Sequence, residues 1–289
     1  MSIFIFPYGH STSPVVGRSY MKLRVGCSGW SYKTWVGPFY PRGAVPENFL
    51  QMYSRVFDSV EIDSTFYGIP DASTVKAWKK ATPEDFRFYP KIPGKITHDQ
   101  RFSGIENTLN AFLDSIGYLG DRLGMILIQL PPFFRYENGS EDLLKFLRLL
   151  PGKFRFAVEF RHDSWFRESV YSELEASGVT LAWSETPFVE TPKIMTTSEV
   201  YLRLVGDRRI PEDRFGSMLL DRSAEIGKWA AELKAMESEI GSASVFANNH
   251  FQGFGPGTVN QFLDQMGRPK IDWGSKILSD HGKKQRTLF

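Results

Sequence analysis

The feature of this sequence that most constrains its fold is a repeated alternation of short β-rich runs with helix-like stretches. The predicted strands are residues 23–28, 59–65, 86–92, 125–130, 154–161, 179–184, 200–205 and 244–249. Apolar residues spaced three and four apart predict helices over residues 46–57, 105–119, 141–150 and 219–240. Repeated strand–helix units favour parallel strands joined by right-handed crossovers. Eight units in about 250 residues match the size of a (β/α)8 barrel, so we predict a single-domain α/β protein of the TIM-barrel type.

Alternation inside the predicted strands favours a barrel over an open sheet. Val60 and Ile62 point to one face of their strand, and Glu61 between them points to the other. A doubly wound sheet, which helices cover on both sides, would be apolar on both faces. The sixth connection, residues 185–198, contains prolines and is predicted to be an irregular loop. Because this connection lacks the expected helix, a doubly wound open sheet stays the alternative fold.

Composition excludes several classes of protein. The 289 residues include 24 Phe, 11 Tyr and 7 Trp, which is far too many for a disordered chain. A single cysteine, Cys27, excludes a disulfide framework and suits the reducing cytoplasm. No run of about 18 apolar residues is present, so we expect no membrane-spanning helix. A formal net charge of +2 indicates no particular partner. We therefore predict a globular, cytoplasmic protein.

The two ends of the chain differ from its centre. Residues 1–20 are predicted to be an N-terminal extension, with translation from Met21 as an open alternative. Residues 21–267 hold the predicted barrel, and residues 268–289 are predicted to be a polar tail. The end of this tail resembles the sliding-clamp-binding motif of DNA-processing proteins, and a solvated basic tail is the alternative. The matching residues are Gln285, Leu288 and Phe289.

Charged side chains gather at the carboxyl ends of the predicted strands, where TIM barrels carry their catalytic groups. Glu61 and Glu159 are the predicted proton carriers, and Lys91 is the third predicted catalytic residue, which holds an anion during the transfer. The alternative is that Glu159 with Arg161, and Glu61 with Lys91, form ion pairs that only brace the barrel. Cys27 alternates outward on its strand and is predicted to pack beneath a helix.

Basic and polar side chains at the same strand ends predict an anionic ligand. Arg161 and Arg203 join Lys91 as cations from three strands, and guanidinium forks suit the oxygens of carboxylate or phosphate groups. The other predicted substrate-binding residues are Gln129, His98, His162, Trp30, Trp165, Asn248 and Asn249. A glycine-rich stretch, residues 250–257, follows the last strand, where barrels often bind phosphate. The alternative is that these glycines only shape the loop into the last helix.

A divalent metal ion at these strand ends is an open alternative. The side chains that would converge on it are His98, His162, His250, Glu61, Asp63 and Glu159. The sequence contains no HxH or HExxH spacing, and His98 lies in a loop where a hydrogen bond is the ordinary use of an imidazole. We therefore assign no metal ligand and no definite cofactor.

Seven segments follow the strand ends in order. They are GCSGWSYKTWVGPFYP, FDSVEIDSTFYGIP, FYPKIPGKITH, LGMILIQLPPFF, FAVEFRHDSWF, YLRLVGD and FANNHFQGFGPGTVNQF. Together they resemble the YecE-like family over residues 23–266, which implies a TIM barrel without a settled biochemical activity. The chain departs from the family's usual pattern at Asp63, where asparagine is usual, and at Val205, where histidine is usual. These departures indicate altered specificity or a degenerate site.

The sequence thus favours an enzyme of the hydrolase or lyase class that acts by acid/base chemistry on a substrate bearing a carboxylate or phosphate. One alternative is a nucleic-acid-binding or nuclease-like barrel that its tail recruits to DNA, although the chain lacks the strong basic stripe typical of such proteins. A second alternative is a non-catalytic barrel that binds a metabolite.

Overall fold

The computed structural model describes residues 21–278. The strands are β1 (Lys22–Cys27), β2 (Ser59–Ile62), β3 (Arg87–Pro90), β4 (Ile126–Gln129), β5 (Phe156–Glu159), β6 (Val179–Leu181), β7 (Trp183–Glu185), β8 (Glu199–Leu204) and β9 (Ser242–Ala247). The α-helices are α1 (Pro46–Val56), α2 (Ser64–Tyr67), α3 (Ala72–Ala81), α4 (Glu106–Gly117), α5 (Tyr136–Leu149), α6 (Glu168–Ala176), α7 (Ser223–Ala235), α8 (Asn249–Gln252), α9 (Gly255–Gln265) and α10 (Trp273–Leu278). Short 3-10 or π-helical turns are η1 (Lys33–Trp35), η2 (Lys95–Asp99), η3 (Gly120–Arg122), η4 (Asp163–Trp165) and η5 (Glu212–Arg214).

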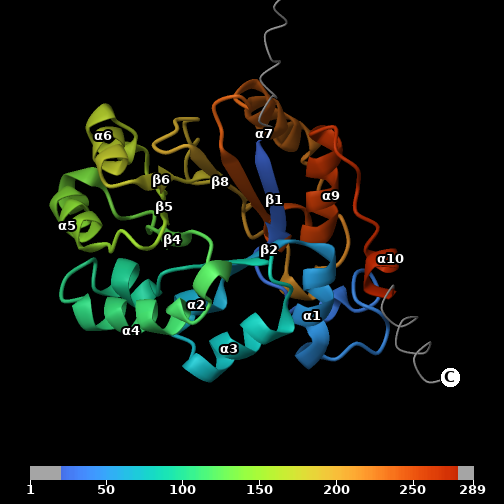
Figure 1. Cartoon of the computed structure of the whole chain (residues 1–289). Helices are drawn as coiled ribbons and strands as arrows, with labels where there is room; N and C mark the ends of the chain where they lie inside the picture. Colours follow the sequence, from blue (N-terminus) through green and yellow to red (C-terminus); the bar gives the residue numbers. More distant parts are fainter. Residues whose placement is uncertain (1–20, 279–289) are drawn as a thin grey trace, which may run out of the picture.

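The strands pair in parallel within three sheets, whose orders are β1-β9-β8-β7, β2-β3 and β4-β5-β6. Helices connect most consecutive strands, and Figure 1 shows them around the outside of the strands. A parallel pair needs a long crossover, and a helix serves because it satisfies its own backbone hydrogen bonds. This arrangement confirms the predicted single-domain α/β fold with parallel strands.

Backbone contacts also join the edges of the three sheets. Ser28, directly after β1, forms a parallel bridge to Glu61 of β2. Lys91, directly after β3, forms a parallel bridge to Leu127 of β4. Only Ala182 separates β6 from β7, so the sheet that contains β6 continues directly into the sheet that contains β7. Each sheet therefore meets its neighbours at these edges.

The buried side chains divide between the two faces of the strands. Two large hydrophobic clusters include residues of the helices, and a third, smaller cluster draws on strands of all three sheets. The third cluster consists of Tyr89, Met125, Leu127, Ala157, Ala182, Tyr201 and Phe246. Ile126 and Ile128, on either side of Leu127, belong to a large cluster, as the two-residue period of a strand requires. The hydroxyls of Tyr89 on β3 and Ser244 on β9 also form a hydrogen bond of 2.7 Å.

The second strand ends earlier than the sequence predicts. β2 stops at Ile62, because Asp63 has helical backbone angles and opens the short helix α2. The Thr65 hydroxyl donates a hydrogen bond of 2.9 Å to the Ile62 carbonyl oxygen and accepts one of 2.9 Å from the Lys91 backbone N–H. Short polar side chains that bond to nearby backbone favour turns over strands, so the predicted strand over residues 59–65 was too long.

The ninth strand also ends earlier than the sequence predicts, and the helices agree with the prediction to different degrees. β9 stops at Ala247, because the Asn248 side chain accepts a hydrogen bond from the His250 backbone N–H and caps α8. α1 and α4 lie close to their predicted positions. α5 begins at Tyr136, before the predicted start, because its first turn is polar and carries no helical apolar spacing. The sixth connection is irregular as predicted, and residues 186–198, all of them described, contain no helix.

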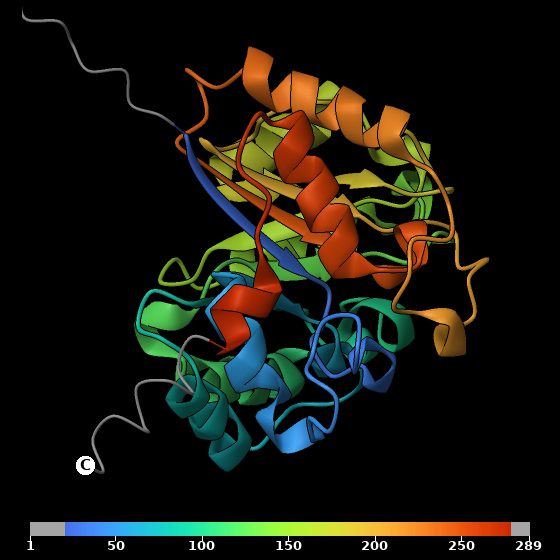
Figure 2. The same cartoon turned by 90° about the vertical axis from the view of Figure 1, so that its right-hand side faces the viewer.

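The described chain continues past residue 267 and packs against the domain. α10 lies beside α1 in Figure 2, and its Ile277 is buried in a large cluster. Trp273 Nε1 donates a hydrogen bond of 3.0 Å to the Pro38 carbonyl oxygen. Residues 273–278, assigned from sequence to the polar tail, therefore form a docked helix. The predicted extension at residues 1–20 and the clamp-binding-like residues Gln285, Leu288 and Phe289 lie outside the described residues.

Between residues 21 and 278 there is no helix with the length and apolar character that crossing a membrane requires.

Candidate functional site

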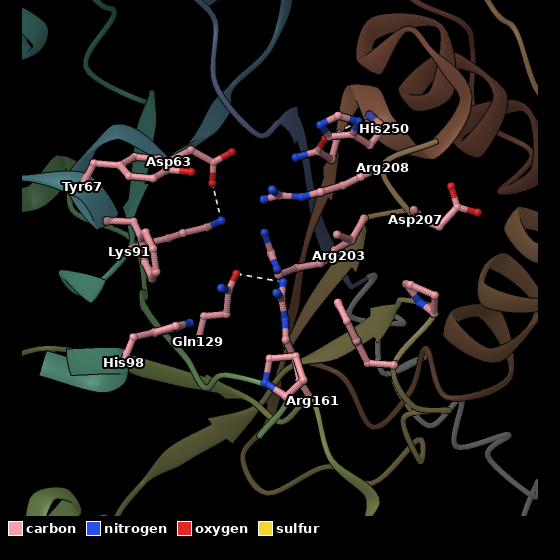
Figure 3. Close-up of a pocket in the computed structure, with 17 residues that line it drawn as sticks. Asp63, Tyr67, Lys91, His98, Gln129, Arg161, Arg203, Asp207, Arg208 and His250 are labelled. Atoms are coloured by element: carbon pink, nitrogen blue, oxygen red, sulfur yellow. Dashed lines mark hydrogen bonds and ion pairs between the residues drawn. The ribbon is translucent and has the colours of Figure 1, made fainter. Parts of the chain in front are cut away.

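A cavity of about 550 Å³ opens at the carboxyl ends of the strands. Its charged lining residues are Asp63, Lys91, Arg161, Arg203, Asp207 and Arg208, and its other polar lining residues include His98, Gln129, Asn248 and His250. Figure 3 shows Asp63, Lys91 and His98 on one side of the cavity, with Arg203, Arg208 and His250 on the other. The fold thus gathers these polar side chains from the carboxyl-terminal parts of six different strands and the segments that follow them, and six of them are predicted site residues.

The floor of the cavity is a buried ion-pair network of Glu61, Glu159 and Arg203, named here the floor network. Arg203 Nε donates to Glu61 Oε2 at 2.7 Å, and Nη2 donates to Glu61 Oε1 at 2.8 Å. Arg203 Nη1 donates to Glu159 Oε2. Ser28 Oγ and the Tyr201 hydroxyl each donate a further hydrogen bond of 2.8 Å to Glu61. The side chains of both glutamates are 0% exposed, so protein groups satisfy these carboxylates without solvent.

Electrostatics keep every member of the floor network charged. Burial would raise the pKa of Glu61, but the positive charges of Arg203 and Lys91 outweigh burial and hold that pKa well below its usual range. Burial likewise opposes ionisation of Glu159, yet Arg161 and Arg203 lower its pKa to about 2. Burial would lower the pKa of Arg203, but the two glutamates raise it well above its usual range. Carboxylates held so acidic are weak bases at neutral pH, which suits them to bracing the strand ends.

Lys91 and Arg161 lie between the floor network and the cavity. Lys91 Nζ forms an ion pair with Asp63 and lies 3.6 Å from the nearer glutamate of the floor network. Arg161 Nε donates to the other glutamate, and its Nη2 donates to Gln129 Oε1 at 2.9 Å. The Arg161 guanidinium also lies 5.2 Å from the ring centroid of Phe188 at the cavity edge. Both cations therefore line the cavity and also lie against the carboxylates of the floor network.

Arg208 is a cavity cation that the sequence analysis did not name. It follows β8, and Figure 3 shows its guanidinium reaching into the cavity. Among the described residues no carboxylate pairs with it, whereas the adjacent Asp207 pairs with Arg209 at 2.7 Å and Arg222 at 2.8 Å. Its φ of 61° is left-handed, which costs about 1–2 kcal/mol for a residue with a Cβ. Strain of this kind clusters at functional sites, and two adjacent arginines within five residues of the end of β8 were the sequence signal.

Two histidines line the cavity from opposite sides, His98 in η2 and His250 in α8. His250 Nδ1 lies 3.1 Å from the Ile210 carbonyl oxygen, which can only accept, so Nδ1 carries the proton and Nε2 the lone pair. His98 Nδ1 shares a hydrogen bond of 2.8 Å with the Thr97 hydroxyl. Burial lowers the pKa of both imidazoles, and neighbouring arginines lower it further. Both rings are therefore neutral at pH 7 and able to accept a proton. Together with Arg208 they are named here the rim.

Comparison with known proteins identifies the family. A family model described as "Protein of unknown function DUF72" matches residues 24–279. The chain belongs to the DUF72 family. YunF of Bacillus subtilis is 26% identical over 271 residues, which cover 84% of this chain and 94% of YunF. YecE of Escherichia coli K12 is 32% identical over 144 residues, half of each chain, and this confirms the resemblance to the YecE-like family.

Solved structures of DUF72 proteins share the fold. The structure of a DUF72 family protein from Thermotoga maritima is 29% identical and superposes with a TM-score of 0.72, covering 86% of this chain and all of that one. A DUF72 family protein from Enterococcus faecalis is 22% identical and superposes with a TM-score of 0.69, covering 85% of this chain and 95% of that one. The family's function is unknown, so the site of this DUF72 protein has to be interpreted from its own residues.

The two tryptophans predicted to bind substrate do not line the cavity of this DUF72 protein. Trp165 is buried, stacked between Phe134 and Phe160, and its Nε1 donates a hydrogen bond of 2.7 Å to the Phe134 carbonyl oxygen. Trp30 is half-buried and packs edge-on against Trp78 at 5.6 Å between ring centroids. An aromatic residue directly after a strand end is equally suited to packing, which is the role that the structure gives both rings.

His162 and Asn249 also lie away from the cavity lining. His162 Nδ1 accepts a hydrogen bond of 3.1 Å from the Ser164 backbone N–H and caps η4. Asn249 Oδ1 accepts hydrogen bonds from Trp35 Nε1 at 3.2 Å and from the Gly255 backbone N–H at 2.9 Å. Both side chains therefore organise the loops that surround the site.

Asp63 and Val205, the two positions that the sequence analysis expects to differ from the family's usual residues, both line the cavity. Asp63 adds a carboxylate that pairs with Lys91. Val205 adds an apolar wall next to Gly206, which has a φ of +78°. A Cβ on Gly206 would overlap the His250 carbonyl, so this glycine lets the loop after β8 lie against α8.

The structure also bears on metal binding and on nucleophilic catalysis by cysteine. Within residues 21–278, no group of three or more His, Cys, Asp or Glu side chains is arranged to hold a metal ion. Cys27 is buried beneath the start of α9, where Gly255 lies against its sulfur, as the strand alternation predicts. Burial raises the pKa of this thiol, so Cys27 is a packing residue and not a nucleophile.

Proposed function

We propose that the three sheets form one closed (β/α)8 barrel and that the cavity is its mouth. The bridge between Ser28 and Glu61, the bridge between Lys91 and Leu127, and the single residue between β6 and β7 support this closure. The small cluster to which all three sheets contribute supports it as well, because side chains on the inner face of a barrel fill its interior. Catalytic groups of such barrels lie at the carboxyl ends of the strands, where this cavity opens.

We propose that this protein is an enzyme whose substrate carries a carboxylate or phosphate group bound in the mouth. The observation that carries the proposal is an imbalance of charge. The cluster of four cations and three carboxylates consists of Lys91, Arg161, Arg203, Arg208, Asp63, Glu61 and Glu159. Asp207, which also lines the cavity, is already paired with Arg209 and Arg222. One positive charge, that of Arg208, lacks a carboxylate among the described residues. An anion that entered the cavity would supply the missing negative charge beside Arg208 and would accept hydrogen bonds from guanidinium groups.

The rim histidines are our proposed proton carriers. The glutamates of the floor network have lowered pKa values and bonded oxygens, so proton transfer by Glu61 or Glu159 would first break the floor. His250 instead presents a neutral imidazole whose Nε2 carries a lone pair, and His98 stands on the opposite side. His250 Nε2 accepts a proton from the substrate, and the imidazolium so formed returns that proton to the product or leaving group. His98 can act in the same way from its own side, and Lys91 stabilises the negative charge that develops on the substrate. Lys91 thus keeps the catalytic role expected from the sequence.

A pair of neighbouring arginines provides the test. Inorganic phosphate is titrated into the wild type, an Arg208→Gly variant and an Arg209→Gly control, and the imidazole signals are followed by NMR. Arg209 is exposed, pairs with Asp207 and lies outside the cavity lining. We expect phosphate to shift the His98 and His250 signals, and Arg208→Gly to weaken binding about tenfold or more, because a hydrogen bond to a charged group is lost. Equal binding by both variants, or no binding to the wild type, would refute the proposal.

A further inference from the structure

A second cavity adjoins the mouth. Its volume is about 780 Å³, and Phe66, Tyr67 and His98 line both cavities. The second cavity, named here the side groove, runs between the segment after α2, which contains Ile69, and the face of α4 that carries Ala111. The shared residues make the two cavities neighbouring compartments, with His98 at their junction.

The wall of the side groove is apolar and open. Tyr67 is 81% exposed and Ile69 is 38% exposed, so both side chains present apolar surface to a ligand in the side groove. The outer end of the Phe66 ring lies against Gly94, where a Cβ would approach the ring to 2.7 Å. The same ring meets His98 edge-on at 5.0 Å between centroids. Glycine at position 94 therefore leaves room for the Phe66 ring, which lines the side groove and contacts the His98 imidazole.

The two compartments differ in charge. Among residues 21–278, the charged side chains that line the side groove are Lys95 and Asp99, whose charges balance, and His98 is neutral. The mouth carries an unbalanced positive charge at Arg208. A molecule that occupied both compartments would therefore place an anionic group in the mouth and an uncharged, largely apolar body in the side groove. Its atoms next to the anionic group would lie beside His98.

We infer that the ligand of this site is an amphipathic small acid, with its carboxylate or phosphate in the mouth and a hydrocarbon body in the side groove against Phe66, Tyr67 and Ile69. This inference rests on the proposed function and specifies its substrate class. Burial of a methylene group contributes about 0.8 kcal/mol, which corresponds to an affinity gain of about fourfold for each added carbon. Chain length is therefore the variable that reports on the side groove, whereas the acidic group reports on the mouth.

The test titrates straight-chain carboxylates from acetate to octanoate, together with inorganic phosphate, into three proteins. The proteins are the wild type, Ala111→Trp, which fills the side groove from the exposed face of α4, and Asn110→Trp as a control. Asn110 is exposed on the same helix and does not line the side groove. We expect affinity to rise about fourfold per carbon in the wild type and in Asn110→Trp. In Ala111→Trp this rise should disappear while acetate and phosphate bind as before.

The outcomes separate the two proposals. If acetate and phosphate bind but chain length has no effect, or has the same effect in Ala111→Trp, the side groove is not part of the site and the inference is wrong, while the proposed function stands. If neither acetate nor phosphate nor any longer acid binds, the proposed function fails and the inference fails with it.

Discussion

The floor network and the rim are both built from polar side chains at strand ends, yet they differ in nearly every physical property. The floor is fully buried, and its charges are paired with each other through short hydrogen bonds. The rim is partly exposed, its arginine lacks a carboxylate partner among the described residues, and its histidines are neutral. A floor of this kind is costly to disrupt, whereas a rim of this kind has hydrogen-bonding capacity left for a ligand.

The difference shows that a charged residue at a strand end is not by itself evidence of catalysis. Arg203 and Arg208 lie on the same strand–loop segment and line the same cavity. Arg203 donates from all three of its guanidinium nitrogens to glutamates, and Arg208 pairs with none of the described carboxylates. We therefore expect substitutions in the floor network to change the stability of the fold, and substitutions in the rim to change the affinity for an anion.

The largest effect is expected from Arg203→Ala in the floor. It removes a guanidinium that donates three hydrogen bonds to two buried carboxylates, and we expect a loss of about 3–5 kcal/mol in the free energy of unfolding. Urea denaturation measures this loss against Arg42→Ala, which is exposed. A loss no larger than that of the control would contradict the structural role of the floor.

The second-largest expected effect is a loss of stability at acid pH, when the floor network is protonated. The pKa of Glu159 falls from its ordinary 4.5 to about 2 in the folded protein, so its stabilising contribution is present above pH 4.5 and is lost as the pH falls towards 2. A shift of this size corresponds to about 3 kcal/mol. Denaturation midpoints between pH 5 and pH 2 check it, with Glu159→Gln for comparison. Glu159→Gln should be less stable than the wild type at pH 7 and should lose less stability as the pH falls. Parallel stability–pH profiles for the two proteins would contradict this role of Glu159.

Gly206 lies in the chain between Arg203 of the floor network and Arg208 of the rim. Gly206→Ala should have an intermediate effect on the free energy of unfolding. A Cβ there is strained by a positive φ and also overlaps the His250 carbonyl. We expect a loss of about 1–3 kcal/mol together with a shift of the His250 NMR signals. Gly43→Ala is the matched control, because Gly43 has a φ of +82° but open space around it. Equal losses would mean that close packing against α8 is unimportant.

The smallest effect on stability is expected from Arg208→Gly in the rim. It removes an exposed side chain and relieves a left-handed backbone, so we expect the free energy of unfolding to change by no more than about 0.5 kcal/mol. Thermal denaturation in phosphate-free buffer is the measurement. A loss comparable to that of Arg203→Ala would place Arg208 in the floor and remove the distinction between the two regions.

Much of the fold was predictable from the sequence, because two-residue alternation and helical spacing are local signals. All eight predicted strands are present, and the segment at residues 179–184 is interrupted only at Ala182. The ends of β2 and β9 were not predictable from apolar pattern, since hydrogen bonds of Thr65 and Asn248 to nearby backbone terminate them. Strand ends are where the site lies, so small boundary errors matter most there.

The site was predictable in location more than in detail. Lys91, Arg161 and Arg203 could be assigned to the mouth because strand order and period place them there. The division into floor network and rim could not be predicted from the sequence, because it depends on which guanidinium reaches which carboxylate in the folded protein. Trp165 shows the same limit, since sequence alone does not distinguish a ring at the mouth from one stacked in the core.

Crystals soaked in tungstate, a heavy analogue of phosphate, would test most directly whether the rim binds anions. We expect a strong anomalous scattering peak in the mouth, within hydrogen-bonding distance of Arg208 and of Lys91 or Arg161, and no such peak in crystals of Arg208→Gly. A mouth without tungstate, while the anion occupies other surface sites, would contradict the central claim that this cavity is built to bind an anion.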